Sequence, residues 1–351
     1  MKANKLILSF TIIILALNSC DDSLQDLDTP LSSGTFILNN GNWGSNDSNI
    51  GFYDPVEKTF TAEAFKTANG QALGDLGQDM TGLGEDIYIA VNGSQTIFVT
   101  GTDLKIRKQI NTEKEGVRLS PRYFAVSDNK VYVTFYEGYV GEILRDYSVQ
   151  LCPVGPNPEG IAVSGGSLYV ANSGGMAYPT YNNTVSVVST STFTETSTIE
   201  VNLNPAKVEA SSDGEYVYVS SFGNYADVPA RLQVITTDGG QVSDLDYASV
   251  SAIARGKDDI LYILCGGYDA NWNPLPGTVY KHDMKNNKPL GTFITDGTAL
   301  SDACSISATS DGYVYIGCSD YINTGDVYVF TPDGRLHDKF DSQGLNPLKA
   351  Y

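Results

Sequence analysis

The sequence has little of the chemistry that most catalytic and metal sites use. It contains two histidines, His282 and His337, and its five cysteines include no Cys-x-x-Cys pair, so a zinc site is not expected. It contains no basic run of about five Lys or Arg residues, and no Gly-rich phosphate loop follows a predicted strand and opens a helix. Nucleic acid and anionic lipid headgroups are therefore poor candidates for partners.

Long apolar runs are also scarce, apart from one at the N-terminus. Lys2 and Lys5 precede an apolar run from Leu6 to Leu17, about twelve residues long and too short to span a membrane. We interpret residues 1–19 as an export signal. The segment Leu17-Asn18-Ser19-Cys20 resembles the bacterial lipobox, in which the cysteine becomes a lipidated N-terminus. An incidental cysteine at the end of a signal peptide is the alternative.

Residues 20–30 are expected to form the lipidated Cys20 and a polar tether. The acidic Asp21, Asp22 and Asp26 resemble the signal that sends lipoproteins of the Bacteroidetes to the outer face of the outer membrane, and a merely solvated tether is the alternative. Removing residues 1–19 would take two lysines from the 22 basic residues and none of the 41 acidic ones, for a net charge of −21. We expect an acidic protein on the cell outer membrane, facing outwards and held by its lipid anchor alone.

Aromatic residues and glycine are abundant, with 22 Tyr, 13 Phe and 35 Gly. An aromatic residue flanked by β-branched or aliphatic residues, with Gly close behind, recurs seven times at intervals of roughly forty to fifty residues. The copies are centred on Phe36, Tyr88, Tyr132, Tyr169, Tyr218, Tyr262 and Tyr315. Such intervals, each holding several short alternating runs, are typical of a four-stranded propeller blade. We predict that residues 31–351 form one all-β domain, a seven-bladed β-propeller.

The repeats also predict how the ring closes. In most copies an inner strand precedes the aromatic residue across a hairpin turn, as in NPEGIAVSGGSLYV. The first copy, at Phe36, has no inner strand ahead of it. The C-terminal segment 346–351, NPLKAY, resembles the start of the inner strand NPAKVEA at 204–210. We predict that this terminal strand completes the first blade and removes the exposed edge of the ring.

Four further cysteines follow Cys20. Cys304 and Cys318 lie on adjacent predicted strands either side of a turn, so a disulfide is one expectation in an exported protein and two buried thiols are the other. Cys152 and Cys265 fall on different blades and are not expected to bridge.

Loops that join second to third strands emerge on one face of a propeller, and here most are long and rich in aromatic residues, Asn and Gly. The candidate ligand-binding residues in them are Asn40, Asn42, Trp43, Tyr136, Tyr139, Tyr178, Tyr181, Phe222, Tyr225, Tyr268, Trp272 and Tyr321. Rings bury much area at small entropic cost and amides fix orientation, which suits a large, flat, partly apolar ligand. The alternative is that these rings pack between blades.

Catalysis has weak support. His282 and His337 are expected on a third and a fourth strand, away from these loops. The carboxylates Glu159, Asp227 and Asp269 could meet near the channel, as an exported hydrolase or lyase or a calcium site would need, but the chain has 41 acidic residues and the pattern is unspecific. We expect a binding protein with no enzymatic activity, no resident cofactor and no metal.

The segment FILNNGNWGSNDSNIGFYDP, the motifs NPEGIAV and NPAKVEAS, and the lipobox resemble the BtuG-type surface lipoproteins of Bacteroides, seven-bladed propellers distantly similar to the YncE-like group. The resemblance covers about residues 30–351. It implies tight capture of cobalamin (vitamin B12) and other corrinoids, and delivery to a TonB-dependent outer-membrane transporter, BtuB. Asn40, Asn42 and Trp43 match the family motif, whereas the other candidates are nominated by position. A glycan, a haem-like tetrapyrrole or a protein is the alternative ligand.

Overall fold

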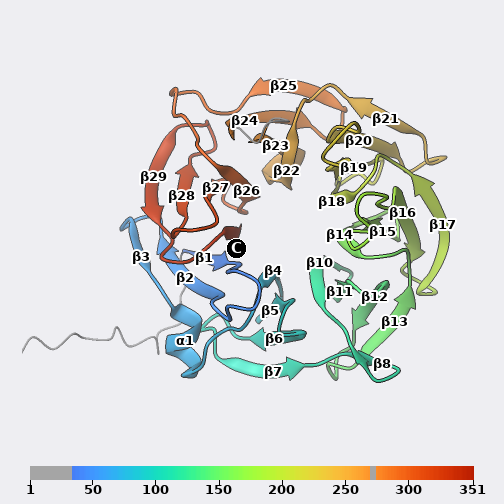
Figure 1. The fold of residues 1–351 in the computed structure, drawn as a ribbon, viewed down its shortest axis with the longest axis horizontal. Coiled ribbons are helices and arrows are strands. Elements are labelled where there is room, and N and C mark those ends of the chain that lie inside the picture. The colour runs from blue at the N-terminus through green and yellow to red at the C-terminus, as the bar shows by residue number, and fades with distance from the viewer. Residues whose placement is uncertain (1–33, 269–273) are drawn as a thin grey trace, which may run out of the picture.

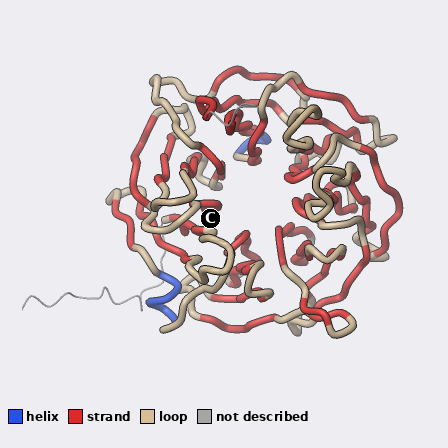
Figure 2. Tube along the Cα trace, viewed as in Figure 1, coloured by secondary structure: helices blue, strands red, loops and turns tan. Residues whose placement is uncertain are grey.

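Each recurring aromatic phrase forms the second strand of a four-stranded antiparallel sheet, and seven such sheets surround a central axis (Figure 1). The structure is a computed structural model that describes residues 34–268 and 274–351. Strand is the dominant element around the whole ring (Figure 2). The predicted all-β, seven-bladed propeller is confirmed. The predicted signal peptide (1–19), the tether (20–30) and Cys20 lie outside the described residues.

We number the sheets as blades 1 to 7 in chain order and give their strands from the axis outwards. Blade 1 consists of β30 (Pro347–Ala350), β1 (Thr35–Asn39), β2 (Asn49–Asp54) and β3 (Thr59–Thr61). Blade 2 consists of β4 (Gly77–Leu83), β5 (Asp86–Val91), β6 (Thr96–Thr100) and β7 (Ile106–Ile110). Blade 3 consists of β10 (Pro121–Ser127), β11 (Lys130–Phe135), β12 (Tyr139–Ile143) and β13 (Val149–Pro153).

The remaining blades follow the same order. Blade 4 consists of β14 (Pro158–Ser164), β15 (Ser167–Asn172), β16 (Thr184–Ser189) and β17 (Thr194–Glu200). Blade 5 consists of β18 (Pro205–Ala210), β19 (Tyr216–Ser221), β20 (Arg231–Thr236) and β21 (Val242–Leu245). Blade 6 consists of β22 (Val250–Arg255), β23 (Ile260–Tyr268), β24 (Pro274–Asp283) and β25 (Lys288–Thr292). Blade 7 consists of β26 (Ala303–Ala308), β27 (Val314–Cys318), β28 (Asp326–Phe330) and β29 (Leu336–Asp341).

Three short elements lie between the strands: helix α1 (Ala64–Asn69), the hairpin β8 (Glu113–Lys114) with β9 (Val117–Arg118), and a 3-10 turn at Lys257–Asp259. No periodic apolar pattern marks α1 in the sequence, because a six-residue helix with two buried residues is too short to produce one. No helix in residues 34–268 or 274–351 is long and apolar enough to cross a membrane.

The core is divided among the junctions between blades. Seven apolar clusters occur, one at each junction, and each combines side chains of two adjacent blades. At the junction of blades 1 and 2, for example, Leu38 and Ile50 pack with Ile89 and Phe98. The second strands are buried on both faces, whereas outer strands such as β17 are exposed along most of their length. The short apolar second strands therefore reflect sheets packed face to face around a ring.

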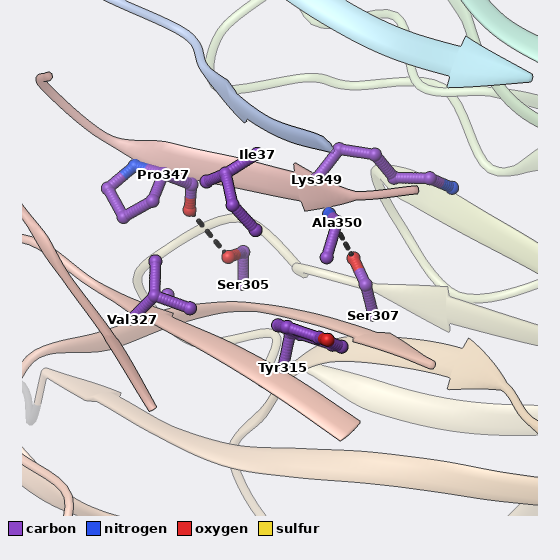
Figure 3. A pocket seen from close by; sticks show the side chains of 9 residues that line it. Ile37, Ser305, Ser307, Tyr315, Val327, Pro347, Lys349 and Ala350 are labelled. Atoms are coloured by element: carbon purple, nitrogen blue, oxygen red, sulfur yellow. Dashed lines mark hydrogen bonds between the residues drawn. The ribbon is translucent and has the colours of Figure 1, made fainter. Parts of the chain in front are cut away.

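The ring closes as the repeats predict. Strand β30 pairs antiparallel with β1, with Ala350 opposite Ile37, and the Tyr351 N–H donates to the Phe36 carbonyl at 2.9 Å. Blade 7 adds two side-chain bonds to this strand (Figure 3): the Ser305 hydroxyl donates to the Pro347 carbonyl at 2.6 Å, and the Ala350 N–H donates to the Ser307 hydroxyl at 3.1 Å. The cavity on this seam has a volume of about 10 Å³, room for about one water.

One backbone hydrogen bond recurs in all seven blades. An N–H at the end of the second strand donates to the carbonyl of the residue just before the inner strand, at 2.8 to 3.1 Å. The donor and acceptor pairs are Asn40 and Asn346, Asn92 and Leu76, Tyr136 and Ser120, Ser173 and Asn157, Phe222 and Asn204, Gly266 and Ser249, and Ser319 and Asp302. In six blades the acceptor residue has a positive φ, a conformation that Asn tolerates better than most residues. This explains the recurring Asn-Pro motif.

The strand pairing also decides the state of the cysteines. Cys152, Cys265, Cys304 and Cys318 are all free thiols, so the disulfide considered for Cys304 and Cys318 does not form. Cys318 pairs with Ala303, and the bulge that opens β26 takes Cys304 out of register with it. Burial raises the pKa of Cys304 to about 11 and that of Cys318 to about 12, which keeps both protonated.

The carbonyl of Asn346 accepts the recurring hydrogen bond in blade 1, and substitutions at Asn346 test how much its side chain and backbone conformation stabilise the fold. Its side chain donates to the Gly41 carbonyl at 2.9 Å and accepts from the Ser319 hydroxyl at 2.7 Å, and its φ is 57°. We expect Asn346→Ala to lower the free energy of unfolding by about 2–3 kcal/mol in denaturant titrations, because the bonds are lost and a Cβ is forced into the left-handed region. Asn346→Gly should cost less by about 1 kcal/mol, since it removes that strain.

Asn323→Ala is the control, because Asn323 bonds only within an exposed turn, to Asp320. We expect it to change the free energy of unfolding by about 0.5 kcal/mol or less. Equal stability of Asn346→Ala and the wild type would contradict the role given to Asn346.

Candidate ligand-binding face

The loops between second and third strands and the linkers between blades meet at one end of the propeller, because the recurring hydrogen bond joins each loop to a linker. We call this end the rim. Its described loops are residues 40–48, 92–95, 136–138, 173–183, 222–230 and 319–325. The linkers that carry α1 and the β8–β9 hairpin belong to the same end, as the bonds from Gln95 to the Arg118 carbonyl and from Gly44 to Asp75 indicate.

Five rim rings from three neighbouring blades form a continuous surface, which we call the aromatic run: Tyr136, Tyr178, Tyr181, Phe222 and Tyr225. Tyr181 lies edge-on to both Tyr178 and Tyr225, with ring centroids 6.0 and 6.1 Å apart. Phe222 stacks with Tyr225 at 6.3 Å. Tyr178 and Tyr225 remain 71% and 62% exposed, so the run offers open ring surface to a ligand. Tyr136 of blade 3 completes the run, because its hydroxyl lies against Gly175 of blade 4. A Cβ on that glycine would be 2.3 Å from the Tyr136 hydroxyl.

Hydrogen bonds within the blade 5 loop fix the position of Tyr225. The Asn224 side-chain oxygen accepts the N–H groups of Ala226 and Val228 at 3.0 and 2.9 Å, and its amide donates to Asp227 at 2.7 Å. Tyr225 itself has a φ of 58°, which a bulky residue seldom adopts. A conformation of this kind persists where the surroundings enforce it, and it concentrates at functional sites. The loop is therefore ordered before any ligand arrives.

Directly inside the run, an ion pair joins blades 3 and 4. The Arg122 guanidinium donates to both carboxylate oxygens of Glu159, at 2.8 Å from Nε to Oε2 and 2.7 Å from Nη2 to Oε1. Its Nη1 donates to Gln78 of blade 2 at 2.7 Å, and its guanidinium carbon lies 5.2 Å from the centroid of the Tyr136 ring. Both charged side chains are less than one-fifth exposed. Arg122 thus connects the inner strands to the base of the aromatic run.

A second group of charges lies on the inner strands further along the axis. The Lys349 ammonium of β30 is 3.3 Å from Asp79 of β4, and Asp79 raises the pKa of Lys349 against the opposing effect of burial. Burial raises the pKa of Glu209 on β18, and Lys349 partly offsets this. The Lys207 ammonium lies 3.5 Å from the centroid of the Tyr123 ring.

Together, Asp79, Arg122, Glu159, Lys207, Glu209 and Lys349 form the axial charge group. Of these, the sequence analysis singled out Glu159 alone. The signal was present, however, because aligning the prolines that open the inner strands places charged residues one or two positions after them, in Arg122, Glu159, Lys207 and Lys349.

The candidates on blade 1 are used differently. The Asn40 amide donates to the Gly77 carbonyl at 2.7 Å, and the Asn42 side-chain oxygen accepts from Asn346 at 3.2 Å, so both side chains hold the rim together. Trp43 is 83% exposed in the same loop, and Tyr321 of blade 7 is 53% exposed.

Tyr139 is a candidate that does not join the aromatic run. Tyr139 was expected in a loop, but it opens β12 and packs against the core at the junction of blades 2 and 3, because pairing with Pro153 extends the strand to it. Tyr268 ends β23. Trp272 lies outside the described residues, as does Asp269.

Among the described residues, the groups considered for catalysis are not assembled. His282 is buried on β24, between the Tyr247 hydroxyl at 3.0 Å and Asn287 at 2.9 Å, and His337 on β29 donates to the Pro55 carbonyl. Both histidines lie away from the rim, as expected. Glu159 is paired with Arg122, whereas Asp227 bonds to Asn224 in its own loop. No cluster of three potential His, Cys, Asp or Glu ligands for a metal occurs within residues 34–268 and 274–351.

A family model described as a domain of unknown function (DUF5074) matches residues 33–331. The chain belongs to this DUF5074 family. No curated protein matches it.

Solved structures share the fold at low sequence identity. A quinonprotein alcohol dehydrogenase-like protein from Bacteroides thetaiotaomicron is 15% identical with a TM-score of 0.63, over 91% of this chain and 78% of that one. Hydrazine synthase from Kuenenia stuttgartiensis is 18% identical with a TM-score of 0.56, over 74% and 79%. The dihydro-heme d1 dehydrogenase NirN is 15% identical with a TM-score of 0.55, over 89% and 64%. The fold thus occurs in enzymes, and the likeness extends to the fold alone.

Arg122→Met tests the ion pair beneath the run. Because it leaves the largely buried Glu159 without its partner, we expect a loss of about 3 kcal/mol in the free energy of unfolding, measured by denaturant titration. The double variant with Glu159→Gln should recover part of this loss. Arg107→Met is the control: the side chain of Arg107 is exposed, so its ion pair with Asp86 is open to water and a loss of about 1 kcal/mol or less is expected. Equal effects of the two single variants would contradict the argument.

His282 predicts a pH dependence. Burial lowers its pKa below the ordinary value of 6.5, so the folded chain takes up this proton at lower pH than the unfolded chain does. The stabilisation by neutral His282 is complete above the ordinary pKa of 6.5 and is lost as the pH falls from there through the lower pKa of the folded state. We expect the wild type to lose more stability between pH 7.5 and pH 5.5 than His282→Gln, in thermal unfolding at each pH. A larger pH effect in the variant would refute this.

Proposed function

We propose that this protein captures a corrinoid, with cobalamin as the leading candidate, on the aromatic run of its rim. The single observation that carries the proposal is the set of adjoining rings on blades 3 to 5, presented by loops whose conformation is already fixed. A corrin macrocycle is broad and carries amide side chains, so it can bury area against rings and exchange hydrogen bonds with rim backbone and amides. Little ordering entropy opposes binding to such a surface.

The cellular setting completes the proposal. A lipid on Cys20 would hold the propeller at the outer face of the outer membrane, and residues 20–30 would let it reach a TonB-dependent transporter of the BtuB type. The exposed Trp43 and Tyr321 on blades 1 and 7 leave a further part of the rim for that contact. The role is binding and delivery, not catalysis, which the pairing of Glu159 and the remote histidines favour.

Titration calorimetry of cyanocobalamin into the protein tests the proposal. We expect tight one-to-one binding, and we expect Tyr181→Ala and Tyr225→Ala each to weaken it by roughly 10- to 30-fold, since truncating a central aromatic contact commonly costs about 2 kcal/mol. Haem and a glycan panel serve as competing ligands for the same rings.

Val56→Ala is the matched control, because Val56 is 78% exposed in the turn between β2 and β3, at the end of the propeller opposite the rim. It should leave affinity unchanged. Trp43→Ala separates the two parts of the rim. Loss of corrinoid binding in Trp43→Ala with full binding in Tyr225→Ala would move the site to blade 1. Absence of binding by the wild type would reject the corrinoid.

A further inference from the structure

The axial charge group contains three cations, and two of them are neutralised by close carboxylates. Arg122 is bonded to Glu159, and Lys349 is 3.3 Å from Asp79. In both cases the ion pair crosses from one blade to its neighbour, which ties inner strands together. The charges of these two cations are therefore already balanced within the protein.

Lys207 is different. Its half-buried ammonium faces the Tyr123 ring at 3.5 Å, and among the described residues no carboxylate forms an ion pair with it. Glu209 on the same strand interacts electrostatically with Lys207, but burial is the main cause of its raised pKa, and Lys349 affects that pKa more strongly than Lys207 does. A partly desolvated ammonium held against a ring retains most of its capacity to bind an anion.

The position of Lys207 relative to the aromatic run follows from contacts. Lys207 lies on β18, the inner strand of the blade that carries Phe222 and Tyr225. The guanidinium carbon of Arg122 lies 5.7 Å from the centroid of the Tyr123 ring and 5.2 Å from that of Tyr136. Arg122 therefore lies between Tyr123, which Lys207 contacts, and Tyr136, which belongs to the aromatic run.

The backbone at Lys207 has little freedom. Gly160 of β14 approaches it so closely that a Cβ there would lie 2.8 Å from the Lys207 Cα. The inner strands of blades 4 and 5 are therefore fixed against each other at this level. The side chain of Lys207 is half-buried, so part of it remains open to solvent.

We propose that the Lys207 ammonium binds a phosphate-ester group of the ligand whose flat body lies on the aromatic run. The inference rests on the proposed function of that run. In a complete corrinoid the group is the phosphodiester of the nucleotide loop, whose negative charge would supply the ion pair that no carboxylate of the described residues makes with Lys207. The surface elsewhere is strongly acidic, with a net charge of −19 over the whole chain, so a cation at this point selects the orientation in which the phosphate enters the axis.

The test compares cobalamin with cobinamide, the corrinoid without the nucleotide and its phosphodiester, in calorimetric titrations of the wild type and Lys207→Met. We expect Lys207→Met to weaken cobalamin binding at least 10-fold and to change cobinamide binding less than 2-fold. Lys207→Arg should retain most of the cobalamin affinity. Lys108→Met, at an exposed site on the outer strand β7, is the control and should change neither ligand.

Salt dependence gives a measurement on the wild type alone. Cobalamin affinity should fall more steeply with sodium chloride than cobinamide affinity, because one charge contact is screened. Equal losses for the two ligands in Lys207→Met, or equal salt slopes in the wild type, would overturn the phosphate site and leave the corrinoid proposal standing. A wild type that binds neither ligand would remove both.

Discussion

The rest of this structure depends on the backbone hydrogen bond from the end of each second strand to the residue before each inner strand. It fixes where the rim loops leave the sheets. It also requires a turn that most side chains resist, which is why Asn precedes Pro at three of the seven inner strands. Because the bond recurs in every blade, the first residue of each loop is held in the same way, whereas the rest of the loop can vary in length and composition. The strands therefore determine the fold, whereas the rim loops carry most of the candidate ligand-binding residues.

In the proposed function, the axis and the rim would contact different parts of the ligand. Apolar clusters at the junctions hold the blades together, so the inner strands are free to carry charge where a simpler ring would carry small residues. Charges near the axis are partly shielded from water, and their interactions are stronger there than on the acidic outer surface. A flat aromatic surface beside such a region suits a ligand that is itself part macrocycle and part ion.

Much of the fold follows from the sequence, and the reason is repetition. Seven copies of one pattern predict the blade number, the strand order and the closure by the C-terminal segment 346–351, because a copy that is hard to interpret can be aligned with the others. The site is less accessible because loops do not repeat. Nothing in the pattern separates Tyr139, which packs in a junction, from Tyr136, which does not. The bonds of Arg122 to Glu159 and Gln78 connect three blades. Contacts between residues so far apart in the sequence cannot be predicted without knowing the register of the inner strands.

The innermost strand of blade 1, β30, comes from the opposite end of the propeller sequence to its partner β1. A ring without β30 would be open, with β1 unpaired on its inner edge and Lys349 missing from the axis. The free inner edge of β1 would then be open to pairing with a strand of another chain. Closure by β30 therefore protects the propeller against association as well as completing its first blade.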